Sequence, residues 1–282
     1  MKTSSQTPDP YAEFAAIYDK WQALHPQPFS LAMTLRMYQA LEEFGVPEDS
    51  LLDIACGSGT LAHWWADRHP SWRIVGVDPS ESMIEKAESR SGEAISPKRA
   101  LVERSGPDPR FVHARPARLD LDEHFGMATC FFDSLNHITT REELLSTLRG
   151  IRRHLVENGL FMFDLIDEDS FEETFSSPWI IQSDSLFVGT ESEFFERRGA
   201  EYGRVIFTSF EKTEASEAES DKGSSSWRRR QFTILERCWR REEFDVLLEE
   251  AGLENIHVQL IDLEDQPDVF VPRRLYVCRP AP

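Results

Sequence analysis

The sequence predicts an α/β fold, with a doubly wound, mostly parallel sheet that carries helices on both faces. Three observations predict it. Apolar segments of strand length alternate with amphipathic segments of helical length along most of the 282 residues. One strand ends near an acid and runs into two closely spaced glycines, in LLDIACGSGTL at 51–61. Stretches with a period of two interrupt the alternation between 167 and 237. We therefore expect one large α/β domain that carries an insert.

Two amphipathic helices are predicted ahead of the first strand. The segment 11–24, YAEFAAIYDKWQAL, has aromatic and aliphatic residues at helical spacing. The segment 30–45, SLAMTLRMYQALEEFG, is a second amphipathic helix, and Gly45 and Pro47 end it.

Seven strands follow, and the helices that connect them complete the pattern. The predicted strands are 51–55, 72–78, 110–114, 127–133, 159–166, 255–262 and 273–279. The predicted helices are 60–68, 79–90, 140–155 and 240–253. Strand 72–78 is almost wholly apolar, which is typical of a parallel strand buried on both faces. Helix 79–90 begins with Pro-Ser-Glu, which are favourable residues for a first helical turn.

The segment 167–237 alternates with a period of two and predicts an antiparallel β insert. Within it, the acidic and serine-rich segment 213–226 contains no apolar residue larger than alanine, so we expect a mobile hairpin tip there. The basic run Arg228–Arg230 lies on a strand, whose alternation sends neighbouring side chains to opposite faces. A solvated edge of the insert is therefore expected there rather than an anion site.

The composition excludes several classes of partner. With 50 acidic and 31 basic residues, the net charge of −19 would repel nucleic acid and anionic membranes. No apolar run approaches membrane-spanning length and the N-terminus has no apolar signal segment, so a cytoplasmic protein is expected. The four cysteines are far apart and form no CxxC or Cys/His cluster, so neither a disulfide framework nor a metal site is expected.

The two glycines after the first strand predict a nucleotide or nucleoside site. Without side chains, Gly57 and Gly59 let the backbone turn tightly and let a ligand approach its N–H groups. Gly57, Gly59 and Ala62 satisfy the pattern G-x-G-x-x-A, and Asp78 ends the next strand nineteen positions after Gly59. Such an acid accepts hydrogen bonds from ribose hydroxyls. The pattern alone leaves open which adenosine-containing cofactor binds.

Several ordered blocks resemble the class I (Rossmann-like) S-adenosylmethionine-dependent methyltransferases. YAEFAAIYDKW is similar to the family's N-terminal lid helix, LLDIACGSGT to its cofactor loop, and IVGVDPSESMIEKA to its ribose-binding strand and helix. ATCFFDSLNHI and GLFMFDLI look like its fourth and fifth strands. The β insert followed by CWRREEFDVLLEEAGL resembles the small-molecule N-methyltransferases, which include enzymes that methylate glycine or the amino group of sugars.

This resemblance implies a division of the chain into three parts. Residues 1–45 would be N-terminal lid helices, and 46–166 with 238–282 a Rossmann-like catalytic domain that binds the cofactor. The antiparallel insert 167–237 would cover the substrate or join two copies of the chain in a homodimer. The substrate would be a small molecule.

The resemblance also implies that S-adenosyl-L-methionine is bound and S-adenosyl-L-homocysteine released. The residues expected to contact this cofactor are Tyr18, Asp53, Ala55, Gly57, Gly59, Thr60, Asp78, Pro79, Met83, Arg115, Pro116, Ala117 and Phe132. Asp78 would accept both ribose hydroxyls, or else cap the helix that follows it. Asp53 would anchor the glycine loop or meet the ammonium group of the cofactor. The sequence departs from the family at Arg115 and Pro116, where an acid commonly receives the adenine amino group, and at Gly126.

The segment FFDSLNHI after the fourth strand holds the expected catalytic groups Asp133 and His137. His137 would orient the acceptor or take its proton, or else cap the next helix. Asp133 would be an electrostatic or hydrogen-bonding partner for a cationic substrate. Tyr18 from the lid is the third expected catalytic residue. The residues expected to bind the substrate are Tyr11, Trp21, Asn136 and His137.

The sequence leaves three classes of function open. The first is methyl transfer to a small-molecule acceptor by direct in-line displacement, at an amine nitrogen, with a hydroxyl oxygen as the alternative. The second is a nicotinamide-dependent oxidoreductase, because G-x-G-x-x-A fits dinucleotides as well. The third is a cofactor-binding module without turnover.

Overall fold

The computed structural model describes residues 11–25, 29–90, 106–213, 226–261 and 271–282. The segment between the predicted helix 79–90 and the predicted strand 110–114 lies largely outside these ranges. The expected hairpin tip at 213–226 lies almost wholly outside them. None of the helices in the described ranges combines the length and the apolar character that crossing a bilayer requires.

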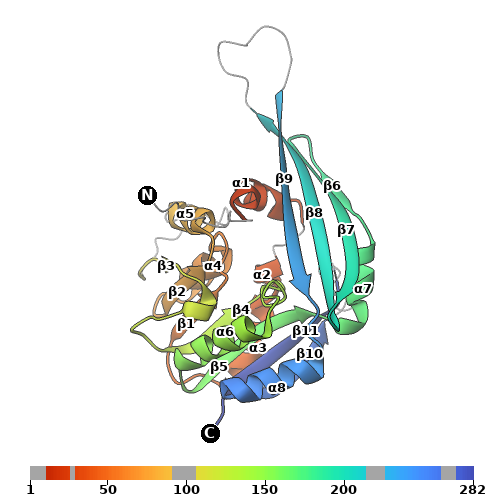
Figure 1. Ribbon diagram of the computed structural model, residues 1–282. Coiled ribbons are helices and arrows are strands. Elements are labelled where there is room, and N and C mark those ends of the chain that lie inside the picture. The colour runs from red at the N-terminus through yellow and green to blue at the C-terminus, as the bar shows by residue number, and fades with distance from the viewer. Residues whose placement is uncertain (1–10, 26–28, 91–105, 214–225, 262–270) are drawn as a thin grey trace, which may run out of the picture.

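The central sheet has seven strands in the order β10-β11-β5-β4-β1-β2-β3 (Figure 1). Its strands are β1 Ser50–Ile54, β2 Arg73–Asp78, β3 Arg110–His113, β4 Phe125–Cys130, β5 Leu155–Ile166, β10 Leu253–Ile261 and β11 Arg273–Pro280. Strands β1 to β5 are mutually parallel, and β11 pairs antiparallel with both β5 and β10. The predicted doubly wound, mostly parallel seven-stranded sheet is confirmed.

Helices cover both faces of this sheet. They are α1 Tyr11–Gln22, α2 Phe29–Ala32, α3 Thr34–Phe44, α4 Thr60–Arg68, α5 Glu81–Ser89, α6 Arg141–Arg153, α7 Glu168–Ser176 and α8 Arg241–Ala251. Leu148 of α6 and Phe244 of α8 are buried in one core cluster with Phe161 of β5. Met37 of α3 and Trp65 of α4 are buried in a second cluster. The sheet therefore has a separate core on each face.

Three local expectations are corrected. The expected helix 30–45 is divided into α2 and α3, which meet around Met33. The fourth strand ends at Cys130 and not at 133, because Phe132 and Asp133 have left-handed backbones with φ of 63° and 50°. The start of the expected β insert is the helix α7, whose buried Phe171 and Phe175 lie four residues apart on one helical face.

A second sheet of four antiparallel strands, which we call sheet B, stands beside the central sheet (Figure 1). It consists of β6 Ile180–Gln182, β7 Leu186–Arg197, β8 Ala200–Thr213 and β9 Ser226–Arg237. Helix α1 lies between sheet B and α5, and Phe14 of α1 stacks on Phe207 of β8 and Phe232 of β9 at centroid distances of 5.7 and 4.8 Å. Helix α1 therefore closes the space between the two sheets.

Candidate active site

A cavity of about 180 Å³ lies where helix α1, the carboxyl ends of the parallel strands and sheet B meet. The residues predicted for the site that line it are Tyr11, Tyr18, Trp21, Ala55, Gly57, Asp78, Pro79, Met83, Phe132, Asp133 and His137. Asp53 and Thr60 line a smaller adjoining cavity of about 50 Å³, again with Tyr18 and Phe132. The fold thus gathers predicted residues from four separate segments of the chain around one space.

Five predicted site residues line neither cavity: Gly59, Arg115, Pro116, Ala117 and Asn136. Arg115 is exposed at the start of the short 3-10 turn Pro116–Arg118, beyond the end of β3. His113, the last residue of β3, instead lies next to the site, and its Nε2 is 3.0 Å from the carbonyl oxygen of Pro79.

The two glycines of the loop after β1 face in opposite directions. Both have left-handed backbones, with φ of 54° at Gly57 and 73° at Gly59. A Cβ on Gly57 would point at Tyr18, 3.7 Å from its hydroxyl, so this residue forms the floor of the cavity. A Cβ on Gly59 would lie 2.7 Å from the ring of Phe111, so Gly59 serves packing. The expectation that both glycines leave open space for a ligand therefore fits only Gly57.

Asp78 at the end of β2 anchors the glycine loop. Its Oδ2 accepts a hydrogen bond from the Gly57 N–H at 2.9 Å, and its Oδ1 accepts one from the Ser80 N–H at 2.8 Å. Ser80 and not Asp78 caps helix α5, because the Ser80 hydroxyl accepts the N–H of Met83. A carboxylate has about four acceptor positions. Asp78 therefore holds the loop, and its carboxylate is the type of acceptor that ribose hydroxyls require.

Asp53 in β1 is a buried carboxylate beside the smaller cavity. It is only 4% exposed, and its Oδ1 accepts a hydrogen bond from the Thr129 hydroxyl at 2.8 Å. Burial raises the pKa of Asp53 to about 7. A bound cation would favour the ionised form of such a group. Asp53 therefore suits the ammonium group of the expected cofactor.

The raised pKa of Asp53 predicts a pH-dependent gain in stability for Asp53→Asn. The folded chain keeps a proton on Asp53 up to about pH 7, whereas the unfolded chain loses it near pH 4, so this group's contribution to stability falls as the pH rises between the two. We expect Asn to raise the free energy of unfolding by about 1–3 kcal/mol at pH 8, and by much less at pH 5. Urea unfolding at the two pH values measures this. The exposed Asp49→Asn is the control, and an equal gain at both pH values would contradict the prediction.

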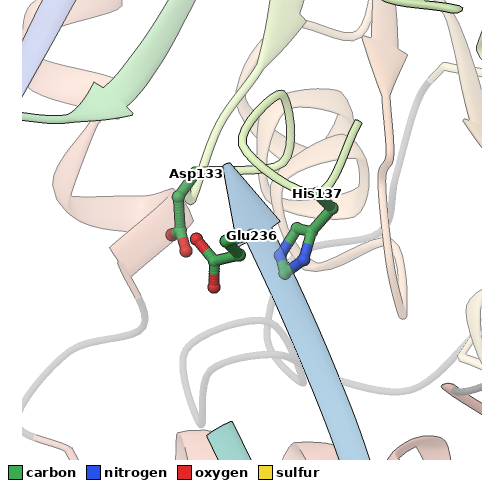
Figure 2. Close-up of side chains that lie close together, drawn as sticks. All are labelled: Asp133, His137 and Glu236. Atoms are coloured by element: carbon green, nitrogen blue, oxygen red, sulfur yellow. The ribbon is translucent and has the colours of Figure 1, made fainter. Parts of the chain in front are cut away.

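Three ionisable side chains meet at the end of the cavity that faces sheet B (Figure 2). One ligand atom from each of Asp133, His137 and Glu236 lies within 4.8 Å of the other two. Glu236 comes from β9 and is 5% exposed, and its Oε2 is buried without a hydrogen-bond partner among the described residues. Burial, and then the charge of Asp133, raise the pKa of Glu236 well above its ordinary value.

The histidine of this group is held by the lid. The His137 Nε2 lies 3.1 Å from the hydroxyl of Tyr11 in helix α1. Burial lowers the pKa of His137, and it raises the pKa of Tyr11. Both side chains are therefore neutral near pH 7, so any charge in this group of three side chains belongs to the carboxyl groups.

Asp133 is fixed in place by two buried residues that the sequence analysis did not select. Arg273 of β11 donates to Asp133 at 2.6 Å and to Asp164 of β5 at 2.8 Å. Asp164 in turn accepts the backbone N–H groups of Phe132 and Asp133 at 2.7 and 3.0 Å. These bonds hold the left-handed turn after β4, so Asp133 points into the cavity as a carboxylate paired with a cation.

Asn136 has a structural place in the same turn. Its side-chain amide donates to the carbonyl of Arg237 at 2.9 Å and accepts the N–H of Ile166 at 3.2 Å. The amide thus ties the turn to β9 and β5 while the residue itself is fully buried. Its expected contact with the substrate stays a prediction that this geometry does not support.

The sequence analysis did not select Glu236 for the site, although the alternation of residues along its strand indicates it. In β9, Phe232 is buried, and Ile234 and Glu236 follow it at a spacing of two and line the cavity. Alternate residues of a strand share a face. An acid on an apolar strand face is therefore detectable. Arg273 and Asp164 gave no such signal, because their pairing joins residues more than a hundred positions apart.

Comparison with known proteins agrees with this geometry. A family model described as a methyltransferase domain matches residues 51–159, from β1 into β5. A crystal structure of an S-adenosylmethionine-dependent methyltransferase from Clostridium acetobutylicum has a TM-score of 0.72 and 22% identity, over 97% of this chain and 100% of that one.

The chain therefore contains a methyltransferase domain over residues 51–159, in the fold of the S-adenosylmethionine-dependent methyltransferases. Its cofactor is S-adenosyl-L-methionine, which decides against the nicotinamide-dependent alternative. The cavity fits this cofactor, because Gly57 leaves its floor free of side chains, Asp78 places a carboxylate on its wall and Asp53 offers a buried carboxylate.

Two curated relatives extend the comparison. A protein of Geobacillus sp. (strain WCH70), named as a methyltransferase without a stated acceptor, is 27% identical over 184 residues, which are 65% of each chain. The dTDP-3-amino-3,4,6-trideoxy-alpha-D-glucopyranose N,N-dimethyltransferase of Streptomyces venezuelae is 26% identical over 165 residues. That alignment covers 56% of the methyltransferase described here and 60% of the relative. The chain thus spans 65% and 60% of the lengths of these two relatives.

Proposed function

We propose that this methyltransferase transfers the methyl group to the amine nitrogen of a small molecule by direct in-line displacement. The observation that carries the proposal is the meeting of Asp133, His137 and Glu236 at one wall of the cavity. Two buried carboxyl groups beside each other suit an acceptor that carries positive charge. The similarity to an enzyme named for dimethylation of an amino sugar supports the same class of acceptor.

The charge of the reaction explains why carboxylates serve here. The cofactor supplies a methyl group on a positively charged sulfur, and a methylated amine carries that positive charge once the transfer is complete. Groups that are already oriented toward a developing charge stabilise the transition state more than the ground state. Asp133, which Arg273 holds in place, is such a group.

Aromatic side chains in the wall of the cavity also favour a positively charged acceptor. Phe14 and Trp21 of α1 and Phe207 of β8 line the cavity. Aromatic ring faces attract cations, by about 0.5–2 kcal/mol or more where water is excluded. Together with the acids, they form a site for an alkylammonium group.

Substrates require an outward movement of helix α1. The cavity of about 180 Å³ is smaller than the roughly 300–1,000 Å³ of ordinary ligand sites. Exposed ion pairs hold the helix against sheet B, between Lys20 and Glu211 at 2.6 Å and between Glu13 and Arg230 at 2.8 Å. Their opening and closing would admit the ligands and then exclude water.

The proposal is tested with S-adenosylmethionine that carries a radiolabelled methyl group. The protein is incubated with a panel of small amines, including amino sugars and amino acids, and with the matching alcohols and phenols. We expect label in amines. Label only in hydroxyl compounds would replace the proposal with oxygen methylation. Tight binding of S-adenosylhomocysteine without transfer to any compound would favour a module without turnover.

The contact between Tyr11 and His137 predicts a moderate kinetic effect. We expect His137→Ala to lower kcat for the best amine about tenfold, because loss of one positioning hydrogen bond costs about 0.5–1.5 kcal/mol. Tyr11→Phe should have a similar effect, and the double variant should be little worse than either, since the two residues act as a pair. His257→Ala, at an exposed position of β10, is the control. Unchanged kcat at every pH would remove His137 from the site.

Three further expectations from the sequence stay predictions. Light scattering would show whether sheet B joins two copies into a homodimer. A gel-shift assay would check that nucleic acid does not bind, as the net charge of −19 implies. Cell fractionation would check the cytoplasmic location.

A further inference from the structure

We propose that Glu236 is the group that removes a proton from the acceptor's ammonium form, with Asp133 as its fixed anionic neighbour. The site would then take amines in the protonated state in which they exist at neutral pH. This inference depends on the proposed amine acceptor and goes beyond it, because it names the base and the charge state of the substrate.

The first argument is the position of the Glu236 carboxyl. It projects from β9 into the cavity, and Figure 2 draws it between Asp133 and His137. Its buried Oε2 has no hydrogen-bond partner among the described residues. An unsatisfied buried oxygen costs about 1–3 kcal/mol, so such an atom in a functional cavity calls for a donor from a ligand. An N–H group of an ammonium ion is a donor of the right charge.

The second argument is that the surroundings assign the negative charge to Asp133. Two carboxyl groups this close resist ionising together, so one keeps a proton. Arg273 donates to Asp133 at 2.6 Å, whereas Glu236 forms no ion pair with any of the described residues. The ionisable groups that act on Glu236 come from the turn after β4, from β5, from β11 and from α1; they are Asp133, Asp164, Arg273 and Tyr11. His137 adjoins it and is neutral.

The third argument is that His137 is less suited to the task. Its Nε2 is already engaged with the Tyr11 hydroxyl, and burial holds its pKa below the ordinary value. A base of lowered pKa removes a proton from an amine less readily. His137 therefore positions the acceptor, and the proton passes to a carboxylate.

The proton balance closes over one turnover. In the empty site Glu236 carries a proton, and binding of R–NH₃⁺ sends that proton to solvent and leaves a carboxylate facing the ammonium. The carboxylate then takes one N–H proton. The freed lone pair forms the N–C bond while the C–S bond of the sulfonium breaks, and its electron pair stays on sulfur. The product leaves as a methylated ammonium ion, and Glu236 is protonated as at the start.

The test is the pH dependence of kcat/KM for the best amine of the labelling panel, in wild type and in Glu236→Gln. At pH 7 we expect Gln to lower kcat/KM about a hundredfold, at the lower end of the 10²- to 10⁴-fold range of a general base. The variant can use only the neutral amine, so its kcat/KM should rise about tenfold per pH unit up to the amine's own pKa. That of wild type should level off at a lower pH, at which Glu236 of the empty site loses its proton. A purely structural role would lower both profiles in parallel.

Controls separate this outcome from misfolding and from failure of the proposed function. Gln matches a protonated Glu in shape, so S-adenosylhomocysteine affinity and Tm should be retained. Glu193→Gln, at an exposed position of β7 in the same sheet, should behave as wild type. Parallel profiles for wild type and Glu236→Gln would overturn the inference and leave amine methylation standing, whereas absence of label in every amine would overturn amine methylation itself.

A last measurement tests whether the same three side chains bind a divalent metal ion instead of an ammonium group. Calorimetric titration with Mn²⁺ or Zn²⁺ should show no binding that Glu236→Gln abolishes. Stoichiometric binding that is lost in the variant would overturn the inference, because Asp133, His137 and Glu236 would then form a metal site.

Discussion

Arg273→Met is expected to lower the free energy of unfolding by about 3–5 kcal/mol. Arg273 is 3% exposed and pairs with both Asp133 and Asp164, and its guanidinium also lies over the rings of Phe29 and Phe132 at 4.6 and 5.3 Å. Removal of one partner leaves two buried carboxylates without a cation. Urea unfolding at pH 8 measures the loss.

The pH gives this prediction a second readout. Without Arg273, the pKa of Asp164, which burial already raises, rises further, and protonation of Asp164 below neutral pH relieves its repulsion with Asp133. The deficit of the variant should therefore shrink between pH 8 and pH 5. Arg274→Met is the matched control, since its side chain is 18% exposed and pairs with Asp167 and Glu168 near the surface. An equal loss for both variants would contradict the role of Arg273.

Gly57→Ala and Gly59→Ala are expected to fail in different ways. At Gly59, a left-handed backbone costs an alanine about 1–2 kcal/mol, and the close approach to Phe111 adds about 1–3 kcal/mol, so stability should fall by about 2–5 kcal/mol. At Gly57 only the backbone cost applies, because the added methyl would be 3.7 Å from the nearest atom of Tyr18. That methyl would instead occupy the floor of the cavity.

Two measurements separate the glycines. Urea unfolding should show the larger loss for Gly59→Ala. Calorimetry should show at least about a tenfold loss of S-adenosylhomocysteine affinity for Gly57→Ala, which corresponds to about 1.4 kcal/mol. The reverse order in either measurement would contradict the placement of Gly57 toward the cavity and of Gly59 toward Phe111.

The sequence predicted the parts of the fold that local patterns determine. Buried strands such as β2 are apolar runs, and the loop after β1 is marked by two closely spaced glycines. Both were therefore located within a few residues. Helix α7 was missed because its apolar residues are few and Phe171 and Phe175 alone do not show a period. The early end of β4 was missed because left-handed backbones at Phe132 and Asp133 depend on Asp164, which is distant in sequence.

The same division holds for the candidate site. Asp133, His137 and Tyr11 were selected because they lie beside recognisable elements, and the structure brings them together. Glu236 and Arg273 were not selected because their roles arise from pairing across the fold. The packing role of Gly59 was also missed, because it depends on Phe111, which belongs to another strand. Glu236 and Arg273 are therefore recognised as site residues from their positions in the structure and not from their residue types.

The cavity draws its two halves from different sheets. The central sheet contributes Asp78 and the glycine loop, while β8 and β9 contribute Phe207, Ile234 and Glu236. In the proposed site, substitutions on β8 and β9 would therefore change which nucleophile binds, without changing the residues that hold the methyl donor. Engineered exchange of those few positions is the natural route to new alkylation chemistry on this scaffold.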